Sequence, residues 1–138
     1  MRLWSIAGHQ LGAIDLAVSP DGKLVATAGL DDVVRVWNAA DGLPVHELRG
    51  HGNQVRAVVF SPDGTRIVSG GADRTAFVWD AASGALLDRL TGNTDEVSRV
   101  AVAADGRIAT AGMDGYLRVF DYRLCLSPAE LEEVGGAG

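Results

Sequence analysis

A chain of 138 residues has room for about one domain, and a formal net charge of −6 lacks the basic excess expected of a general nucleic-acid binder. The single cysteine, Cys125, cannot form a disulfide within the chain, which fits a reducing compartment. No apolar run approaches the roughly 18 residues of a membrane span, and the first residues do not resemble a signal peptide. We therefore expect a cytoplasmic protein with neither nucleic-acid nor membrane partners.

The first unit of regular structure follows Gly8-His9. Short runs of β-branched and apolar residues lie between clusters of glycine, aspartate and proline, which is typical of strands. The predicted strands span residues 13–18, 24–28 and 33–37. Ser19-Pro20-Asp21-Gly22 predicts a turn between the first two, because proline fixes φ, aspartate caps the turn and glycine accepts positive φ.

The same order of strands and turns then recurs twice. The glycines at positions 8, 50 and 92 are 42 residues apart in both steps. The further predicted strands span residues 45–49, 55–60, 66–70, 75–79, 86–90, 97–102, 107–111 and 116–120. Several strands are apolar at nearly every position, whereas a sheet with one wet face would alternate. Each sheet is therefore expected to have a neighbour on both faces.

Gly-His, Ser-Pro-Asp-Gly and Trp-Asp recur together in register, and through these motifs the chain up to about residue 122 resembles the WD40 repeat family. The resemblance implies an all-β fold of WD40-type β-propeller blades, each a four-stranded antiparallel sheet. Propellers typically close with roughly 4–8 blades. Three four-stranded antiparallel blades would therefore form an incomplete ring.

The resemblance also sets the expected boundaries within the chain. The expected segments are an orphan outer strand (2–7), three repeats (approximately 8–49, 50–91 and 92–122) and a C-terminal tail (123–138). Ser127, Pro128 and Glu130 in the tail are typical of the start of a short helix.

Each repeat carries a histidine or asparagine after a glycine, a hydroxyl side chain in the second strand, an aspartate in the next turn and an aromatic residue in the third strand. The three sets are His9, Thr27, Asp31 and Trp37; His51, Ser69, Asp73 and Trp79; and Asn93, Thr110, Asp114 and Phe120. The resemblance implies that each set is a hydrogen-bonded structural tetrad. Phe120 lacks an indole N–H, so we expect the third blade to lose this network and to rely on apolar packing.

Ser69, His51 and Asp73 also contain the side chains of a hydrolase triad. The same kind of set recurs in every repeat, however, whereas an enzyme needs a single site, and we predict no catalytic residues. The spacing of His9, His46 and His51 matches no common zinc site, and no glycine-rich phosphate-binding motif occurs. We therefore expect neither a metal nor a cofactor.

The resemblance implies that partners bind the face formed by the loops before the first strand and between the second and third strands. The candidate contacts on this face are Arg56, Arg74, Asp95, Glu96, Arg99 and Met113. Simple solvation is the alternative explanation for these charges.

The leading functional prediction is a protein–protein interaction scaffold without catalytic activity. The alternative is a structural or assembly fragment of a larger or homo-oligomeric propeller, with no partner other than propeller blades. Three stacked repeats would leave the outer faces of the end blades exposed. We therefore expect either head-to-tail self-association, in which the outer strand of another copy completes the third blade, or the missing blades of a longer propeller.

Overall fold

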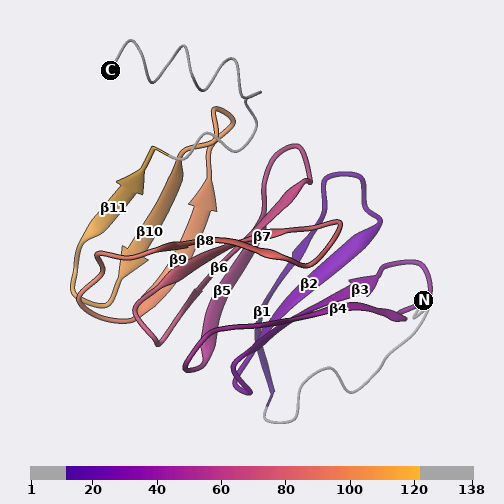
Figure 1. Cartoon of the computed structure of the whole chain (residues 1–138), viewed down its shortest axis with the longest axis horizontal. Coiled ribbons are helices and arrows are strands. Elements are labelled where there is room, and N and C mark those ends of the chain that lie inside the picture. Colours follow the sequence, from indigo (N-terminus) through magenta and orange to yellow (C-terminus); the bar gives the residue numbers. More distant parts are fainter. Residues whose placement is uncertain (1–11, 122–138) are drawn as a thin grey trace.

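The computed structural model describes residues 12–121, and every regular element in this part of the chain is a strand (Figure 1). The strands are β1 (Ala13–Val18), β2 (Leu24–Gly29), β3 (Val33–Asn38), β4 (Pro44–Arg49), β5 (Val55–Phe60), β6 (Arg66–Gly71), β7 (Ala76–Asp80), β8 (Leu86–Leu90), β9 (Val97–Val102), β10 (Ile108–Gly112) and β11 (Leu117–Phe120). The predicted all-β fold is confirmed for residues 12–121, and each strand predicted within this range lies within one residue of its expected bounds. No helix in residues 12–121 is long and apolar enough to cross a membrane.

Hydrogen bonds join the strands into three antiparallel sheets, here called blades 1, 2 and 3. Blade 1 has the order β1-β2-β3-β4 and blade 2 the order β5-β6-β7-β8, whereas blade 3 contains only β9-β10-β11. Within the described residues, blade 3 therefore shows three of the four strands expected of each blade. Blades 1 and 2 take their fourth strands from the segment after each Trp, but the residues after Asp121 lie outside the described part. The expected outer strand 2–7 and the helical tail 123–138 lie outside it too.

The Ser-Pro-Asp-Gly turns show why the inner strands reverse so tightly. Asp21 Oδ1 accepts hydrogen bonds from the Ser19 hydroxyl, at 2.6 Å, and from the Lys23 amide, at 3.0 Å. Gly22 has a φ of 73°, a left-handed conformation that glycine adopts without steric cost. Each turn is thus closed by its own side chains, which fixes the register of the strands that follow.

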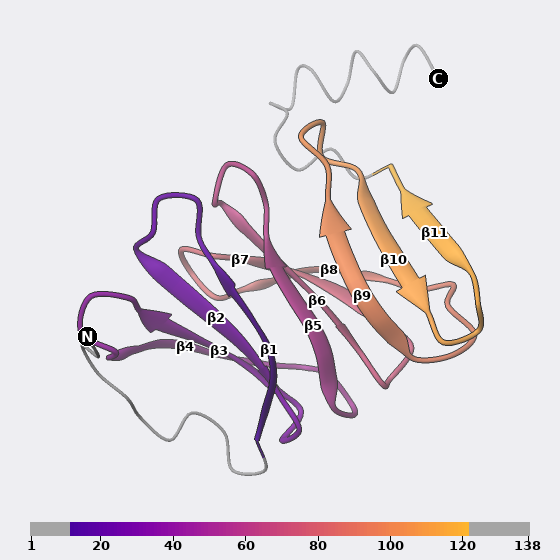
Figure 2. The ribbon, with the colours of Figure 1, turned by 180° about the vertical axis from the view of Figure 1, so that it is seen from behind.

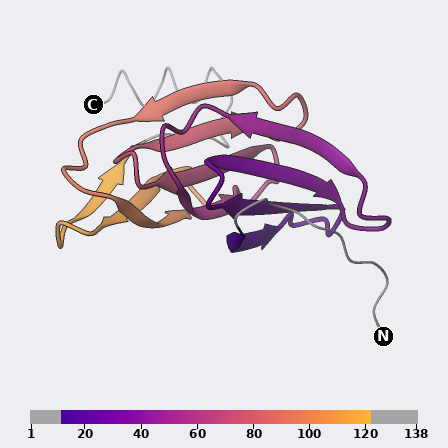
Figure 3. The same cartoon turned by 90° about the horizontal axis from the view of Figure 1, so that it is seen from below.

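The blades stand side by side, with blade 2 in the middle (Figures 1 and 2). From below, the purple blade 1 and the yellow end of blade 3 lie at opposite ends of the row (Figure 3). One hydrophobic cluster lies between blades 1 and 2 and includes Val34, Leu48, Ile67 and Trp79. A second cluster lies between blades 2 and 3 and includes Val68, Val78, Val97 and Ile108. Each core is therefore shared by two neighbouring blades.

Three polar or steric contacts fix how closely the blades approach. The Val58 amide of blade 2 donates a hydrogen bond of 3.2 Å to Asp15 of blade 1. At the outer edge, His46 Nε2 lies 3.1 Å from the Ala82 carbonyl oxygen. A Cβ atom at Gly70 would lie 2.5 Å from Cγ1 of Val97, so blades 2 and 3 approach one another more closely than any side chain at position 70 allows.

The two end faces of the row are apolar and exposed. Leu16 is 63% exposed on β1, although Val58, one period of 42 residues later, is only 1% exposed because it packs on blade 1. Val119 is 59% exposed on β11, whereas its counterpart Val78 in blade 2 is fully buried. Each open end thus exposes an apolar face. The corresponding face of the middle blade is packed against a neighbouring blade.

Candidate functional site

The polar set of blade 2 forms one continuous hydrogen-bonded chain. Trp79 Nε1 donates to Ser69 Oγ at 2.8 Å, and Ser69 Oγ lies 2.7 Å from His51 Nε2. His51 Nδ1 lies 2.9 Å from Asp73 Oδ2, which also accepts the Gly52 amide at 3.1 Å. An ionised carboxylate can only accept, so Nδ1 carries the proton and Nε2 accepts the Ser69 hydroxyl. The chain therefore links the loop before β5 to strands β6 and β7.

His51 is held by packing as well as by hydrogen bonds. Its ring stacks on Phe77, with ring centroids 4.1 Å apart and an interplanar angle of 15°. Gly71 leaves room for the ring, because a Cβ there would lie 2.9 Å from His51 Nδ1. Ser69 is fully buried and both neighbours of its hydroxyl lie within the blade, so this oxygen does not reach a substrate.

Blade 1 shows the same arrangement in part. Trp37 Nε1 donates to Thr27 Oγ1 at 3.0 Å, which corresponds to the Trp79–Ser69 contact. Asp31 Oδ2 lies 3.1 Å from Arg35 Nη2, an ion pair on the side of the turn next to β3. His9 lies outside the described residues.

Blade 3 retains a polar network, so the prediction that it loses one is wrong. Arg118 Nη1 donates to Asn93 Oδ1 at 3.1 Å and to Asp114 Oδ2 at 3.0 Å. Thr110 is buried, and its hydroxyl lies 3.4 Å from Asn93 Oδ1. Phe120 takes no part and packs against the apolar cluster between blades 2 and 3. Arg118, whose role was not predicted, links Asn93 to Asp114 through its guanidinium, whereas His51 bonds directly to Asp73 in blade 2.

The turn aspartates make the fold sensitive to acid. Hydrogen bonds from the Thr94 side chain and the Tyr116 amide, together with Arg118, hold the pKa of Asp114 far below its usual range. Burial alone would raise the pKa of Asp73, but the hydrogen bond from His51, together with those from the Gly52 and Thr75 amides, outweighs it and keeps this pKa low. Both carboxyls are therefore deprotonated in the fold at a pH at which the unfolded chain already binds protons.

We therefore expect the free energy of unfolding to be steady at neutral pH and to fall as the pH drops below about 4, the ordinary pKa of an aspartate. Urea unfolding followed by circular dichroism at pH 7, 4 and 3 measures this dependence. Asp114→Asn should lower stability at pH 7 and also give a shallower loss on acidification. An unchanged slope in this variant would contradict the assignment.

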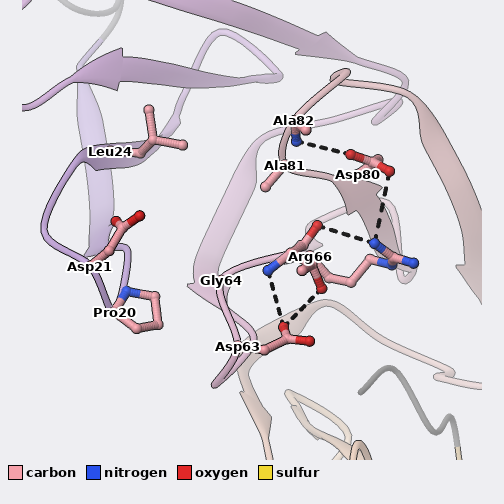
Figure 4. A pocket seen from close by; sticks show the side chains of 10 residues that line it. Pro20, Asp21, Leu24, Asp63, Gly64, Arg66, Asp80, Ala81 and Ala82 are labelled. Atoms are coloured by element: carbon pink, nitrogen blue, oxygen red, sulfur yellow. Dashed lines mark hydrogen bonds and ion pairs between the residues drawn. The ribbon is translucent and has the colours of Figure 1, made fainter. Parts of the chain in front are cut away.

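Among residues 12–121, no group of three or more histidine, cysteine or acidic side chains is arranged to hold a metal ion. The hollow between the turns of blades 1 and 2, of about 410 Å³, does contain several charges, including Asp21, Asp63, Asp80 and Arg66 (Figure 4). These carboxylates cap their own turns: Asp63 Oδ1 accepts the Thr65 amide at 3.0 Å, and Asp80 Oδ1 accepts the Ala82 amide at 2.9 Å. The clustering of these carboxylates is therefore explained by their role in capping the turns.

A second hollow, of about 220 Å³, lies at the opposite end of the inner strands. Its lining residues are Ile14, Arg56, Glu96, Ser98, Arg99 and Met113. Four of the residues predicted as partner contacts are thus brought together, whereas Arg74 and Asp95 do not line the hollow. Ile14 and Ser98 were missed, although they stand one repeat period of 42 residues before and after Arg56.

Arg74 stands apart in the turn between β6 and β7. Its φ is 70°, in the left-handed region, and its side chain is exposed. At the corresponding positions, blade 1 has Asp32, with a φ of 70°, and blade 3 has Gly115, with a φ of 84°. The left-handed conformation is therefore a property of this turn in all three repeats, and Arg74 is the residue that places an exposed cation there.

The sequence is similar to a known family of repeat proteins and to parts of several known proteins. The sequence matches the family described as "WD40: WD domain, G-beta repeat" over residues 1–38, 42–80 and 84–121. Protein HIR1 of Mycosarcoma maydis is 38% identical over 55 residues, which cover 40% of this chain and 5% of that protein. The transcriptional corepressor LEUNIG_HOMOLOG of Arabidopsis thaliana is 38% identical over 53 residues, covering 38% of this chain and 7% of that protein.

Solved structures show the same likeness in three dimensions. The crystal structure of the RRP9 WD40 repeats superposes with a TM-score of 0.74 at 27% identity, over 77% of this chain and 32% of that one. The structure of U3-55K gives the same TM-score and identity, over 77% of this chain and 33% of that one. The chain therefore spans about a third of the length of these structures, and less than a tenth of the two sequence relatives.

Proposed function

This chain belongs to the WD40 repeat family, and from that premise we propose that it is a protein-interaction scaffold without catalytic activity, whose loop face binds a protein partner. We define the loop face by Arg56, Arg74, Glu96, Arg99 and Met113. The observation that carries the proposal is the contrast between two polar groups. In blade 2 the tetrad side chains are bonded to one another, and His51, Ser69 and Trp79 are buried. The charged side chains around the hollow, Arg56, Glu96 and Arg99, are instead partly or largely open to solvent.

Two further observations support the loop face as the binding surface. Arg74 adds an exposed cation in the turn between β6 and β7, at a position where blade 3 has glycine. The hollow lined by Arg56 and Arg99 includes residues of all three blades, from Ile14 in β1 to Met113 after β10, so it depends on the stacking of the repeats. A surface assembled from several repeats is the usual binding surface of repeat proteins.

The proposal is tested by quantitative affinity capture from cell extract with the intact protein as bait. Alanine at Arg56, Arg74 and Arg99 together should reduce the captured amount of each specific partner by at least about tenfold, because charged contacts at an interface contribute on the order of 1 kcal/mol or more each. Arg66→Ala, at the opposite end of the blades, is the matched control and should capture the wild-type amount. Equal capture by the triple variant would contradict the proposal, provided that its molecular mass is unchanged.

A second candidate function, assembly with further propeller blades, is favoured by the two open end faces. We propose head-to-tail self-association, in which the face carrying Leu117 and Val119 packs on the face carrying Leu16 and Val18 of a second copy. The corresponding faces of the middle blade are already paired in this way within the chain. Contact between different faces requires a closed ring, because an unclosed arrangement continues to add copies.

Light scattering coupled to size-exclusion chromatography tests this assembly. The wild-type chain should elute at a whole-number multiple of 14.4 kDa, and Leu16→Asp should elute as a monomer because it places a charge in the shared face. Leu87→Asp is the control, because Leu87 is exposed on the outer strand β8, away from both end faces. A folded wild-type monomer at micromolar concentration would overturn the self-association proposal and leave the scaffold proposal standing.

A further inference from the structure

The hollow at the loop face has an unequal distribution of charge. Arg56 Nη2 lies 3.1 Å from Glu96 Oε1, and both side chains are about one-third exposed, so these two charges compensate each other. Arg99 has no acidic partner among residues 12–121, and its Nη1 donates to the backbone carbonyl of its neighbour Ser98 at 3.2 Å. The hollow therefore presents one uncompensated positive charge on a chain whose net charge is −6.

A guanidinium in this position favours a carboxylate as its ligand. Its planar, five-donor geometry matches a carboxylate, with which it forms paired, charge-assisted hydrogen bonds. One hydrogen bond to a backbone carbonyl leaves most of the donors of Arg99 available. The position of Arg99 on the inner strand β9, next to the bonded Ser98, limits the positions that the guanidinium can reach.

Ile14 and Met113 give the hollow an apolar wall. Ile14 is 38% exposed and Met113 is 62% exposed, and both line the same space as Arg99. Methionine adapts to apolar groups of different shape, because its unbranched side chain is flexible and polarisable. The hollow thus pairs one cation with an apolar wall, which matches an acidic residue that has an apolar neighbour.

A nucleic-acid strand is a poorer match for this surface. Binding of a phosphate backbone draws on several lysine or arginine contacts in a row. Here Arg56 is engaged by Glu96, and Asp95 adjoins the same edge, so successive phosphates would meet acidic side chains. A single carboxylate at Arg99 avoids this repulsion.

We propose that this hollow binds the side chain of an aspartate or glutamate in a partner protein segment, with an adjoining apolar residue packed on Ile14 and Met113. The inference rests on the proposed scaffold function, which it deepens by naming the chemistry of the partner. Arg99 is the specificity residue. The Arg56–Glu96 pair forms the opposite side of the site and restricts it to one negative charge.

Fluorescence anisotropy with two labelled synthetic peptides tests the proposal. The first peptide has a central glutamate flanked by leucines, and the second is identical except for glutamine in place of the glutamate. The intact protein should bind the glutamate peptide about tenfold or more tightly than the glutamine peptide, as expected for a charge-assisted pair. Arg99→Gln should remove this preference, and Arg99→Lys should restore part of it. Arg66→Gln, at the other end of the blades, should leave it unchanged.

The proposal is overturned if the wild-type protein binds both peptides equally or if Arg99→Gln keeps the preference. Displacement of the glutamate peptide by single-stranded DNA at a lower concentration than by unlabelled peptide would also overturn it, in favour of phosphate recognition. Failure here is distinguishable from failure of the scaffold proposal. Loss of capture in the triple loop-face variant, combined with indifference to the glutamate, would retain the scaffold and exclude the acidic ligand.

Discussion

Replacing Trp79 with alanine should lower the free energy of unfolding by about 3–5 kcal/mol, which is the range for removing a large buried aromatic side chain. Trp79 is 1% exposed and packs in the cluster between blades 1 and 2. Its ring centroid lies 5.5 Å from that of Phe77, and its N–H donates to Ser69. The substitution therefore opens a cavity between two blades and removes one donor of the tetrad.

Trp79→Phe separates these two effects. Most of the apolar volume is retained, but Ser69 loses a hydrogen-bond donor while its oxygen stays buried, and we expect a loss of about 1–3 kcal/mol. Urea unfolding followed by far-ultraviolet circular dichroism gives both values without relying on tryptophan fluorescence. Phe120→Ala, at the corresponding position of blade 3, should cost less than Trp79→Ala, because Phe120 is only partly buried. Equal losses for these two alanine variants would contradict the role given to the tetrad of blade 2.

Gly70→Ala should be unusually destabilising for so small a change, by about 1–3 kcal/mol, because it overpacks a close contact between blades. The added Cβ would lie 2.5 Å from Cγ1 of Val97 and 2.9 Å from Cγ1 of Val100, both on the inner strand of blade 3. Blade 3 would have to move away from blade 2. The other two repeats can be compared with this variant, because they already have alanine, Ala28 and Ala111, at the positions that match Gly70.

A double-mutant cycle with Val97→Ala identifies the cause of this loss. Val97→Ala alone should destabilise by leaving a cavity in the second cluster, since Val97 is fully buried. With both changes, the Cβ at position 70 occupies space vacated by the valine, so the double variant should be more stable than the sum of the two losses by about 1 kcal/mol. Additive losses would contradict this steric cause, because Gly70 lies in β6 without a positive φ and its backbone does not require glycine.

The repeat pattern was sufficient to predict the strands, because strand and turn signals occur in the same order in each unit. The tetrad positions could be located in the same way, and in blade 2 their side chains do meet. The role of Arg118 could not be found by looking only at those four positions. It reaches Asp114 across the turn from the next strand, as Arg35 reaches Asp31 in blade 1. The shared spacing of these two pairs was the available signal.

The hollow at the loop face shows a different limit of sequence reasoning. Arg56, Arg99 and Met113 could be assigned to the loop face because they lie in or next to the loops that the family resemblance places there. Ile14 reads as an ordinary apolar strand residue, and only the stacking of blade 1 against blade 2 places it beside Arg56. The contact between Arg56 and Glu96 likewise joins residues 40 positions apart, across two blades. Such neighbours depend on how blades stack, which local sequence patterns do not specify.

The sharing of each hydrophobic cluster by two blades has a consequence for cooperativity. Most of the apolar burial belongs to the seams between blades, and these three blades have two seams. Any open row has one seam fewer than it has blades, whereas a closed circle has as many seams as blades. Closure therefore adds a seam without ordering another blade, and stability per residue rises at that step. In the open row, amide hydrogen exchange should be slowest in β5 to β7, the strands with a seam on either side, and faster toward both ends.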